Sequence, residues 1–254
     1  MIFDAKLSAA GVWAAIAAEA EHIAAADAVI GRSLSTAIFD HEGLEGALAF
    51  QIGLKLGHAG DRRTFRHAAE QAFQLSPEIV DAAAVDLQGI RARDPASAGF
   101  LAVLLNFKGY IALQAWRVSN WLWLNDRPDL ALLFQSASSD ALQVSIHPAA
   151  TVGRSVFLDH GTGIVVGAFA AIGDDVTILQ NVTVGRGGHG GAPTIGRGVF
   201  LGAGATVLGE VVVGDFARIG AGTMVIGDVP AGCTAVGIPA RLVNCPEQEL
   251  AAQS

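Results

Sequence analysis

One short stretch in the second half of the chain holds the residue types needed for proton transfer. Asp159 and His160 stand together in LDHGTG, between small residues that leave room around the imidazole. A histidine with an ordinary pKa of about 6.5 can accept a proton from a hydroxyl group at neutral pH. The stretch therefore indicates a general base at His160, with a surface histidine of no chemical role as the alternative. His147, in IHPAAT, precedes a proline, which favours a structural role.

A glycine-rich loop around His189 is the second candidate. The histidine is flanked by Gly187, Gly188, Gly190 and Gly191. Glycine permits sharp turns and lets the backbone approach a ligand closely. Loops on a regular scaffold often carry its binding residues. We therefore expect this loop to lie beside a bound molecule.

These candidates lie within a repeat that runs from Ile146 to about Leu242. A period of six residues fits neither a helix nor a simple amphipathic strand. It is typical of a hexapeptide β-helix, in which each six residues form a short strand and three strands complete a triangular coil. The seven residues GHGGAPT interrupt the count once. The residues expected to lead each six and to point inward are Ile146, Val152, Leu158, Ile164, Ala170, Val176, Val182, Ile195, Leu201, Val207, Val213, Ile219 and Val225.

The first half of the chain is rich in alanine and leucine at helical spacing. Ser76-Pro77-Glu78 reads as a helix start, with a capping hydroxyl and proline at the first helical position. The sequence thus predicts an α+β protein: an α-helical domain over 1–142, a left-handed parallel β-helix over 143–245 and a short tail over 246–254. The expected helices are 4–28, 31–39, 43–57, 61–74, 77–92, 97–105, 108–125 and 128–142.

Composition excludes several classes of function. The formal charge of −8 and the absence of a basic cluster argue against nucleic-acid binding. The most apolar stretch of the first half is interrupted by polar residues, so we expect no membrane span. The N-terminus does not resemble a signal peptide, which favours a cytoplasmic protein. Cys233 and Cys245 are the only cysteines, lack a metal-ligand spacing, and are expected to be reduced.

Four motifs taken together resemble the serine O-acetyltransferases, a family of hexapeptide-repeat acyltransferases: DHGTGIVVG, SIHPAATVG, RARDPAS and KGYIALQAWRVSNWLW. The resemblance covers about residues 5–244, including the helical domain, which many other hexapeptide acyltransferases lack. It implies transfer of acetyl from acetyl-CoA to the hydroxyl of L-serine, giving O-acetylserine for cysteine biosynthesis. It also implies a helical oligomerisation domain and a homotrimer or dimer of trimers, with active sites between neighbouring prisms.

The resemblance also assigns roles to individual residues. His160 matches the general base, and Asp159 and Asp94 match the carboxylates that hold the ammonium group of the acceptor. Arg241 matches a basic position that meets a CoA phosphate. Neither a metal nor a covalent enzyme intermediate is implied. The small residues that match the path of the CoA arm are Gly185, Ala203, Gly204 and Ala221.

The acceptor site departs from the family pattern at two places. Ser145 replaces an aspartate that orients the catalytic imidazole, and serine carries no charge to stabilise an imidazolium. The loop is shorter and lacks the family's Arg-His pair, whose arginine grips the substrate carboxylate. His189 and Arg186 are the candidate replacements in this chain.

A third departure concerns the tail, which ends Ala251-Ala252-Gln253-Ser254 rather than in the isoleucine that docks into O-acetylserine sulfhydrylase. We therefore expect no such complex. Two alternatives to a serine O-acetyltransferase remain open: a CoA-dependent acyltransferase with another hydroxyl or amine acceptor, and a non-catalytic structural or regulatory β-helix. A zinc-dependent carbonic anhydrase on the same prism is set aside, because His147, His160 and His189 do not show the spacing of its ligands.

Overall fold

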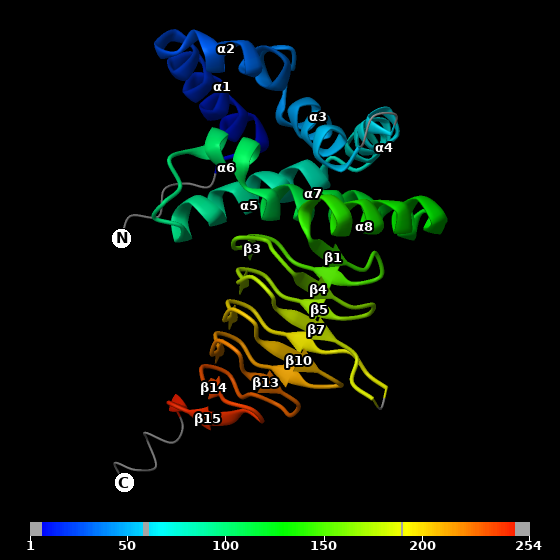
Figure 1. The fold of residues 1–254 in the computed structure, drawn as a ribbon, viewed down its shortest axis with the longest axis vertical. Coiled ribbons are helices and arrows are strands. Elements are labelled where there is room, and N and C mark those ends of the chain that lie inside the picture. The colour runs from blue at the N-terminus through cyan, green and yellow to red at the C-terminus, as the bar shows by residue number, and fades with distance from the viewer. Residues whose placement is uncertain (1–6, 58–60, 189, 247–254) are drawn as a thin grey trace.

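The computed structural model describes residues 7–57, 61–188 and 190–246, and it confirms the predicted architecture. The helices gather at the top, with α5, α7 and α8 directly above a stack of β-coils and α1 to α4 farther from it (Figure 1). The helical elements are α1 (Ala9–Ala26), α2 (Ala28–Leu34), a π-helix η1 (Ser35–Phe39), α3 (Leu44–Leu56), α4 (Arg62–Leu75), α5 (Glu78–Arg93), α6 (Phe100–Asn106), α7 (Lys108–Leu124) and α8 (Pro128–Leu142).

The helix boundaries differ from the predicted ones in two informative ways. The segment predicted as one helix over 31–39 is split between the end of α2 and the π-helix η1. At α5, Pro77 rather than Ser76 is the capping residue and no side chain caps the helix. The backbone carbonyl of Ser76 instead accepts from the amide of Ile79 at 3.0 Å. The helix therefore starts at the predicted place, but the proline occupies the cap rather than the first helical position, and the predicted capping hydroxyl is wrong.

Below the helices, the described residues include fifteen short strands, which form the three faces of a β-helix that is parallel except for its last strand. The first sheet has the order β1-β4-β7-β10-β13, the second β11-β8-β5-β2 and the third β15-β14-β12-β9-β6-β3. The strands are β1 (Val144–Ile146), β2 (Thr151–Val152), β3 (Phe157–Leu158), β4 (Ile164–Val166), β5 (Ala171–Ile172), β6 (Thr177–Ile178), β7 (Thr183–Gly185), β8 (Thr194–Ile195), β9 (Phe200–Leu201), β10 (Thr206–Leu208), β11 (Val212–Val213), β12 (Arg218–Ile219), β13 (Met224–Val225), β14 (Thr234–Val236) and β15 (Arg241–Val243).

All thirteen residues predicted to lead the repeats are buried, at 8% exposure or less. Their burial inside the prism supplies the hydrophobic stabilisation of the coils. The interior continues upward into the helical half, because one contiguous core cluster includes residues of both halves, from Val12 in α1 to Ala235 in β14.

The strand register corrects the hexad count at one place. Ile146 pairs with Val166, twenty residues later, whereas Val166 pairs with Val184, eighteen residues later. Two extra residues therefore lie between β3 and β4, in the segment that contains His160. A regular coil has eighteen residues, but Val184 pairs with Val207, twenty-three residues later. The loop therefore adds five residues to its coil, rather than the seven predicted. The period alone missed this shift because both Ile164 and Val166 are buried.

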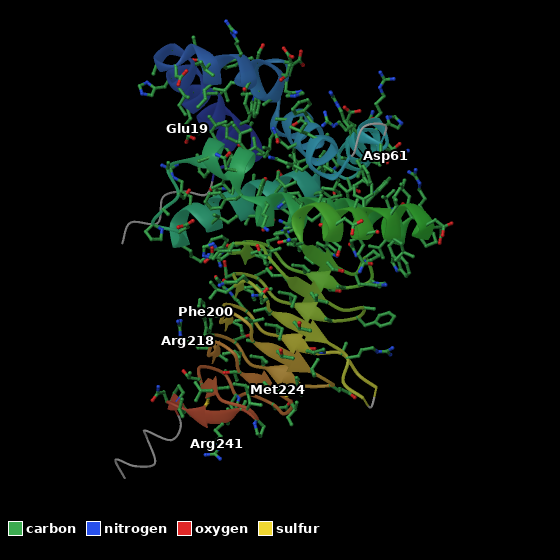
Figure 2. The ribbon with its side chains drawn as sticks, in the orientation of Figure 1. Glu19, Asp61, Phe200, Arg218, Met224 and Arg241 are labelled. Atoms are coloured by element: carbon green, nitrogen blue, oxygen red, sulfur yellow. A yellow bond between two sulfur atoms is a disulfide. The ribbon has the colours of Figure 1, made fainter. Side chains whose placement is uncertain are left out.

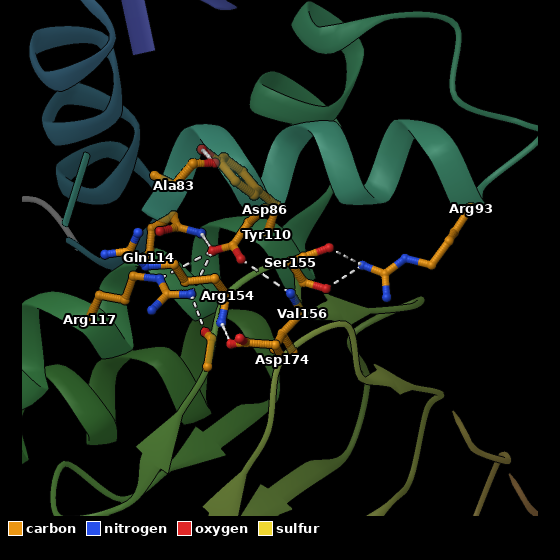
Figure 3. A network of polar contacts seen from close by, with 11 residues as sticks. Ala83, Asp86, Arg93, Tyr110, Gln114, Arg117, Arg154, Ser155, Val156 and Asp174 are labelled. Carbon is orange, nitrogen blue, oxygen red and sulfur yellow. Dashed lines mark hydrogen bonds and ion pairs between the residues drawn. The ribbon is translucent and has the colours of Figure 1, made fainter. Parts of the chain in front are cut away.

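A buried polar network joins the helical half to the first coil (Figure 3). Asp86 of α5 is fully buried and accepts from Gln114 Nε2 at 2.9 Å and from Arg117 Nη2 at 2.8 Å, both on α7. The other carboxylate oxygen of Asp86 accepts from the amide of Val156 at 3.2 Å, and Arg117 Nη2 also donates to the carbonyl of Gly153 at 2.7 Å. Burial raises the pKa of Asp86, and the Arg117 charge opposes that shift.

The cysteines differ from expectation. Cys233 and Cys245 form a disulfide, because the antiparallel pairing of β15 with β14 brings the two ends of this hairpin together. The tail beyond residue 246 lies outside the described residues. Within the described ranges, no helix combines the length and apolar character that a membrane crossing requires.

Candidate functional site

One edge of the prism gathers five of the predicted site residues: Asp159, His160, Ala203, Gly204 and Ala221. We call it the base edge: the line of corners where strands of the third sheet turn into strands of the first. Backbone hydrogen bonds stack these corners. The amide of Asn181 donates to Thr162 at 2.7 Å, and the amide of Gly204 donates to Gln180 at 2.9 Å. One coil lower, the amide of Gly222 donates to Ala203 at 2.8 Å.

Asp159 and His160 occupy the first corner of the base edge, at the two-residue insertion. The amide of Asp159 donates to the carbonyl of Ile178 at 2.8 Å, which fixes the start of the turn. His160 adopts a positive φ of 57°, a conformation uncommon for a residue with a side chain, and its side chain is 70% exposed. His160 Nε2 lies 3.9 Å from Asp159 Oδ1. That distance is too long for a hydrogen bond, so the imidazole is free to bond a substrate hydroxyl.

The start of α7 packs directly against this turn. A Cβ added to Gly109 would lie 2.1 Å from the carbonyl oxygen of Leu158, the residue before Asp159. A Cβ added to Gly161 would lie 2.8 Å from the Cα of Gly109, at a φ of +57°. Only glycine therefore fits on both sides of the contact, and the turn carrying the histidine is held against the backbone of α7.

Asp94 lies at the C-terminal end of α5, and its side chain is partly exposed. Its amide donates to the carbonyl of Ile90 at 2.8 Å, and its Oδ1 accepts from the amide of Ala96 at 2.8 Å. These bonds hold the residue in a fixed turn. The neighbouring Arg93 bonds to the beginnings of β3 and β6, so Asp94 is linked to the strand that leads into Asp159.

Ala203, Gly204 and Ala221 line the base edge below His160, each with part of its surface exposed. Arg241 lies on β15, the last strand of the third sheet (Figure 2). Five strand spacings separate β15 from β3, which is about 24 Å at the usual interstrand distance. The edge thus offers a long strip of small residues with a histidine at one end and an exposed cation at the other.

Gly185 and Arg186 lie elsewhere. Gly185 ends β7 and Arg186 follows it, where strands of the first sheet turn toward the second, and we call this corner line the loop edge (Figure 1). Arg186 is exposed; its Nε donates to the carbonyl of Gly190 at 3.1 Å and its guanidinium stands 5.9 Å from the ring centroid of Phe169. His189 lies outside the described residues. Within one chain, therefore, the fold does not bring Arg186 to His160.

Two further polar residues of the first coil have structural partners. Ser145 Oγ accepts from Gln135 Nε2 at 3.1 Å. His147 Nδ1 accepts from the amide of Ala149 at 3.0 Å, and burial lowers the pKa of this histidine. Its carbonyl accepts from Trp116 Nε1 at 3.1 Å, which anchors α7 to the coil. Among the described residues, no group of three or more histidine, cysteine or acidic side chains has the geometry to hold a metal ion.

Comparison with known proteins decides the family. Residues 12–115 match the family model described as serine acetyltransferase, N-terminal, and residues 192–227 match bacterial transferase hexapeptide (six repeats). A curated serine acetyltransferase of Escherichia coli strain K12 is 43% identical over 242 residues, which are 94% of this chain and 89% of that protein. The chain belongs to the serine acetyltransferase family.

Solved structures of serine acetyltransferases share its fold over nearly the full length. A soybean serine acetyltransferase complexed with serine superposes with a TM-score of 0.89 at 42% identity, covering 94% of this chain and 100% of that one. A serine acetyltransferase from Brucella abortus in complex with coenzyme A gives a TM-score of 0.89 at 39% identity, covering 92% and 95%.

Sequence reasoning missed two residues that contact the coil near Asp159 and Asp94. Gly109 and Arg93 lie in helices, far along the chain from the turn they contact. Gly109 carried one signal, because a glycine at the second position of an otherwise strong helix has a packing or functional reason. Arg93 carried none beyond its place next to Asp94.

Proposed function

We propose that this protein transfers acetyl from acetyl-CoA to the hydroxyl of L-serine, with His160 as the general base. The base edge carries the proposal, because it joins an accessible histidine, an adjacent carboxylate and a strip of small residues that ends at a cation. The serine and coenzyme A complexes of the soybean and Brucella relatives support the same two substrates.

In this mechanism His160 removes the proton of the serine hydroxyl as the oxygen attacks the thioester carbon. The collapse of the tetrahedral species expels the CoA thiolate, which takes up a proton. The exposed imidazole supports this role. Asp159 and Asp94 would hold the serine ammonium group through charge-assisted hydrogen bonds. Backbone amides of the coil corners would stabilise the oxyanion.

Acetyl-CoA would lie along the base edge with its thioester near His160. Ala203, Gly204 and Ala221 have side chains too small to block an extended arm, which supports this path. Arg241 would then meet a phosphate of CoA at the far end. Gly185 belongs to the loop edge, so it would contact CoA only from a neighbouring chain.

The separation of the two edges supports a homotrimer, alone or within a dimer of trimers, as the active form. A site with the carboxylates of Asp159 and Asp94 and the histidine His160 leaves the serine carboxylate in need of a cation. Arg186 on the loop edge of a neighbouring prism is an exposed cation that could meet this need. Active sites would then lie between chains, with the helical half joining the chains.

A different acceptor is the second candidate function. Ser145 is engaged by Gln135 and carries no charge, so it offers an imidazolium less stabilisation than the family's aspartate. The shortened loop lacks the arginine that family members aim at the acceptor carboxylate. Both observations favour an acceptor other than serine, or a slower enzyme.

The experiment is CoA thiol release from acetyl-CoA with L-serine, D-serine, L-homoserine, L-threonine and simple amines as acceptors. His160→Ala is the test variant. His67→Ala is the matched control, because His67 on α4 is 84% exposed and lies outside the proposed site. We expect serine-dependent release that falls by about 100-fold or more in His160→Ala and persists in His67→Ala. Release with another acceptor alone would support the second function, and no release with any acceptor would refute both.

A further inference from the structure

Arg93, the last residue of α5, makes an unusually complete set of hydrogen bonds for a half-buried arginine. Its Nη2 donates to the carbonyl and the hydroxyl of Ser155, at the corner before β3. Its Nη1 donates to the carbonyl of Asp175 at 2.7 Å and to Thr177 Oγ1 at 3.3 Å, at the same corner one coil lower. One guanidinium therefore ties the end of a helix to two successive coils (Figure 3 shows its bonds to Ser155).

The surrounding chain is shaped to admit this side chain. Arg93 Nε donates back to the carbonyl of Gly89 at 2.9 Å, which fixes the direction of the guanidinium. A Cβ added to Gly89 would lie 2.2 Å from Ser155 Oγ and 2.9 Å from Arg93 Nη2. The glycine thus provides the space in which the arginine meets the coil, and the planar fork reaches both corners as a lysine ammonium cannot.

This clamp joins the two chain segments that carry the carboxylates of the proposed acceptor site. Asp94 follows Arg93 directly, and its backbone is held by the carbonyl of Ile90. On the coil side, Ser155 and Asp159 are separated only by Val156 and the two residues of β3. The Arg93–Ser155 contact therefore links the residue before Asp94 to a residue four positions before Asp159.

We propose that Arg93 is a positioning residue for acceptor binding, which sets the spacing between Asp94 and Asp159 on which capture of the substrate ammonium group depends. The proposal rests on the proposed function. It differs from a purely structural role in one respect: loss of the clamp should weaken acceptor binding selectively. Because acetyl-CoA would lie along the lower coils, its affinity should change little.

The test is steady-state kinetics of Arg93→Lys on the full-length protein, measured as CoA release. We expect KM for serine to rise about tenfold or more, since a displacement of ~1 Å at a binding group has effects of this size or larger. KM for acetyl-CoA should stay within about twofold. Thr177→Val, which removes one acceptor of Arg93, is a milder variant that should shift serine KM in the same direction.

Arg197→Lys is the matched control. Arg197 also bonds Asp175, at 2.9 Å, but its side chain is 62% exposed, and the hydrogen bonds that it donates and its ion pair among the described residues go to Asp175 and Asp215 rather than to α5. It should leave both KM values unchanged. Equal changes in both KM values for Arg93→Lys, or an unchanged serine KM, would overturn the proposal.

A double-mutant cycle with Asp94→Asn separates positioning from general stability. If Arg93 acts through Asp94, the pair of substitutions should raise serine KM no further than Asp94→Asn alone. Additive effects would overturn the proposal. If serine does not increase CoA release by the wild-type protein, the proposed function is refuted, and this inference with it. The wild-type measurement therefore distinguishes failure of the proposed function from failure of this inference alone.

Discussion

Gly109→Ala tests how the helical half holds the turn that carries His160. The new Cβ would lie 2.1 Å from the carbonyl oxygen of Leu158. Carbon and oxygen atoms in contact stay about 3.3 Å apart, so the turn or the start of α7 must move by about 1 Å. Because the obstacle is backbone, no side-chain rotation relieves the overlap, and the next two residues are Asp159 and His160.

A displacement of this size at a catalytic group costs on the order of 100-fold in rate, equivalent to ~2.7 kcal/mol of transition-state stabilisation. Helix propensity acts in the opposite direction, because glycine-to-alanine replacement within a helix stabilises by about 0.5–1 kcal/mol. We therefore expect kcat/KM for serine to fall by about 100-fold in Gly109→Ala, without the gain in melting temperature that propensity alone predicts.

The assay is acceptor-dependent CoA release together with thermal melting. Gly46→Ala is the control, because Gly46 also lies in the first turn of a helix, α3. Its added Cβ would lie 3.3 Å from His41 Nδ1, a side-chain atom that needs to shift by only a few tenths of an ångström. Gly46→Ala should keep full activity. A Gly109→Ala protein with wild-type activity and a raised melting temperature would show that the contact does not hold the turn.

Two further predictions follow from the buried network and from the far end of the base edge. Arg117→Met should destabilise the protein by about 3–5 kcal/mol, because it leaves Asp86 buried without its cation. Burial already holds the pKa of Asp86 above its ordinary value. A carboxyl with a raised folded pKa loses stabilisation as the pH rises through that value, so urea denaturation should show a larger loss at pH 8 than at pH 5; an equal loss at both would contradict this. Arg241→Ala should raise KM for acetyl-CoA about tenfold, less so at high salt, because it removes an exposed cation. Arg218→Ala is the control, because Arg218 is an exposed cation on the same sheet, with its guanidinium 4.6 Å from the ring centroid of Phe200. It should leave KM for acetyl-CoA unchanged. An equal rise in this KM for Arg218→Ala and Arg241→Ala would exclude a specific contact between Arg241 and CoA.

The fold was predictable because both halves carry a strong local period. Residues such as Val207 and Ile219 recur every six positions and are fully buried, as predicted. The position of the two-residue insertion was not predicted, because in the middle coils two positions of each six are buried. The pairs Val156/Leu158 and Ile164/Val166 show the shift, since the step between pair starts grows from six to eight. Following both buried positions of each six, rather than one, would have revealed the insertion.

The site was predictable in part, and the limit is one of distance along the chain. Asp159 and His160 are neighbours in sequence, so their proximity needed no structure. The contact of Arg93 with Ser155 spans 62 residues, and no local pattern encodes it. The expectation of reduced cysteines was wrong for a related reason. The pairing of Cys233 with Cys245 depends on the antiparallel return strand β15, which does not follow the six-residue repeat.

Both halves of the chain therefore contribute to the proposed site: the coil carries two of its residues and the helices fix their positions. The coil supplies His160 and Asp159, but a coil corner with two extra residues is not fixed by the repeat that fixes its neighbours. Its position is set instead by Gly109 of α7, while Arg93 of α5 sets that of Asp94. Asp86 and Arg117 then hold these two helices to each other and to the first coil. We therefore expect a β-helix severed from its helices to keep the proposed base, His160, and to lose the geometry by which the base and the two proposed carboxylates would act on one substrate.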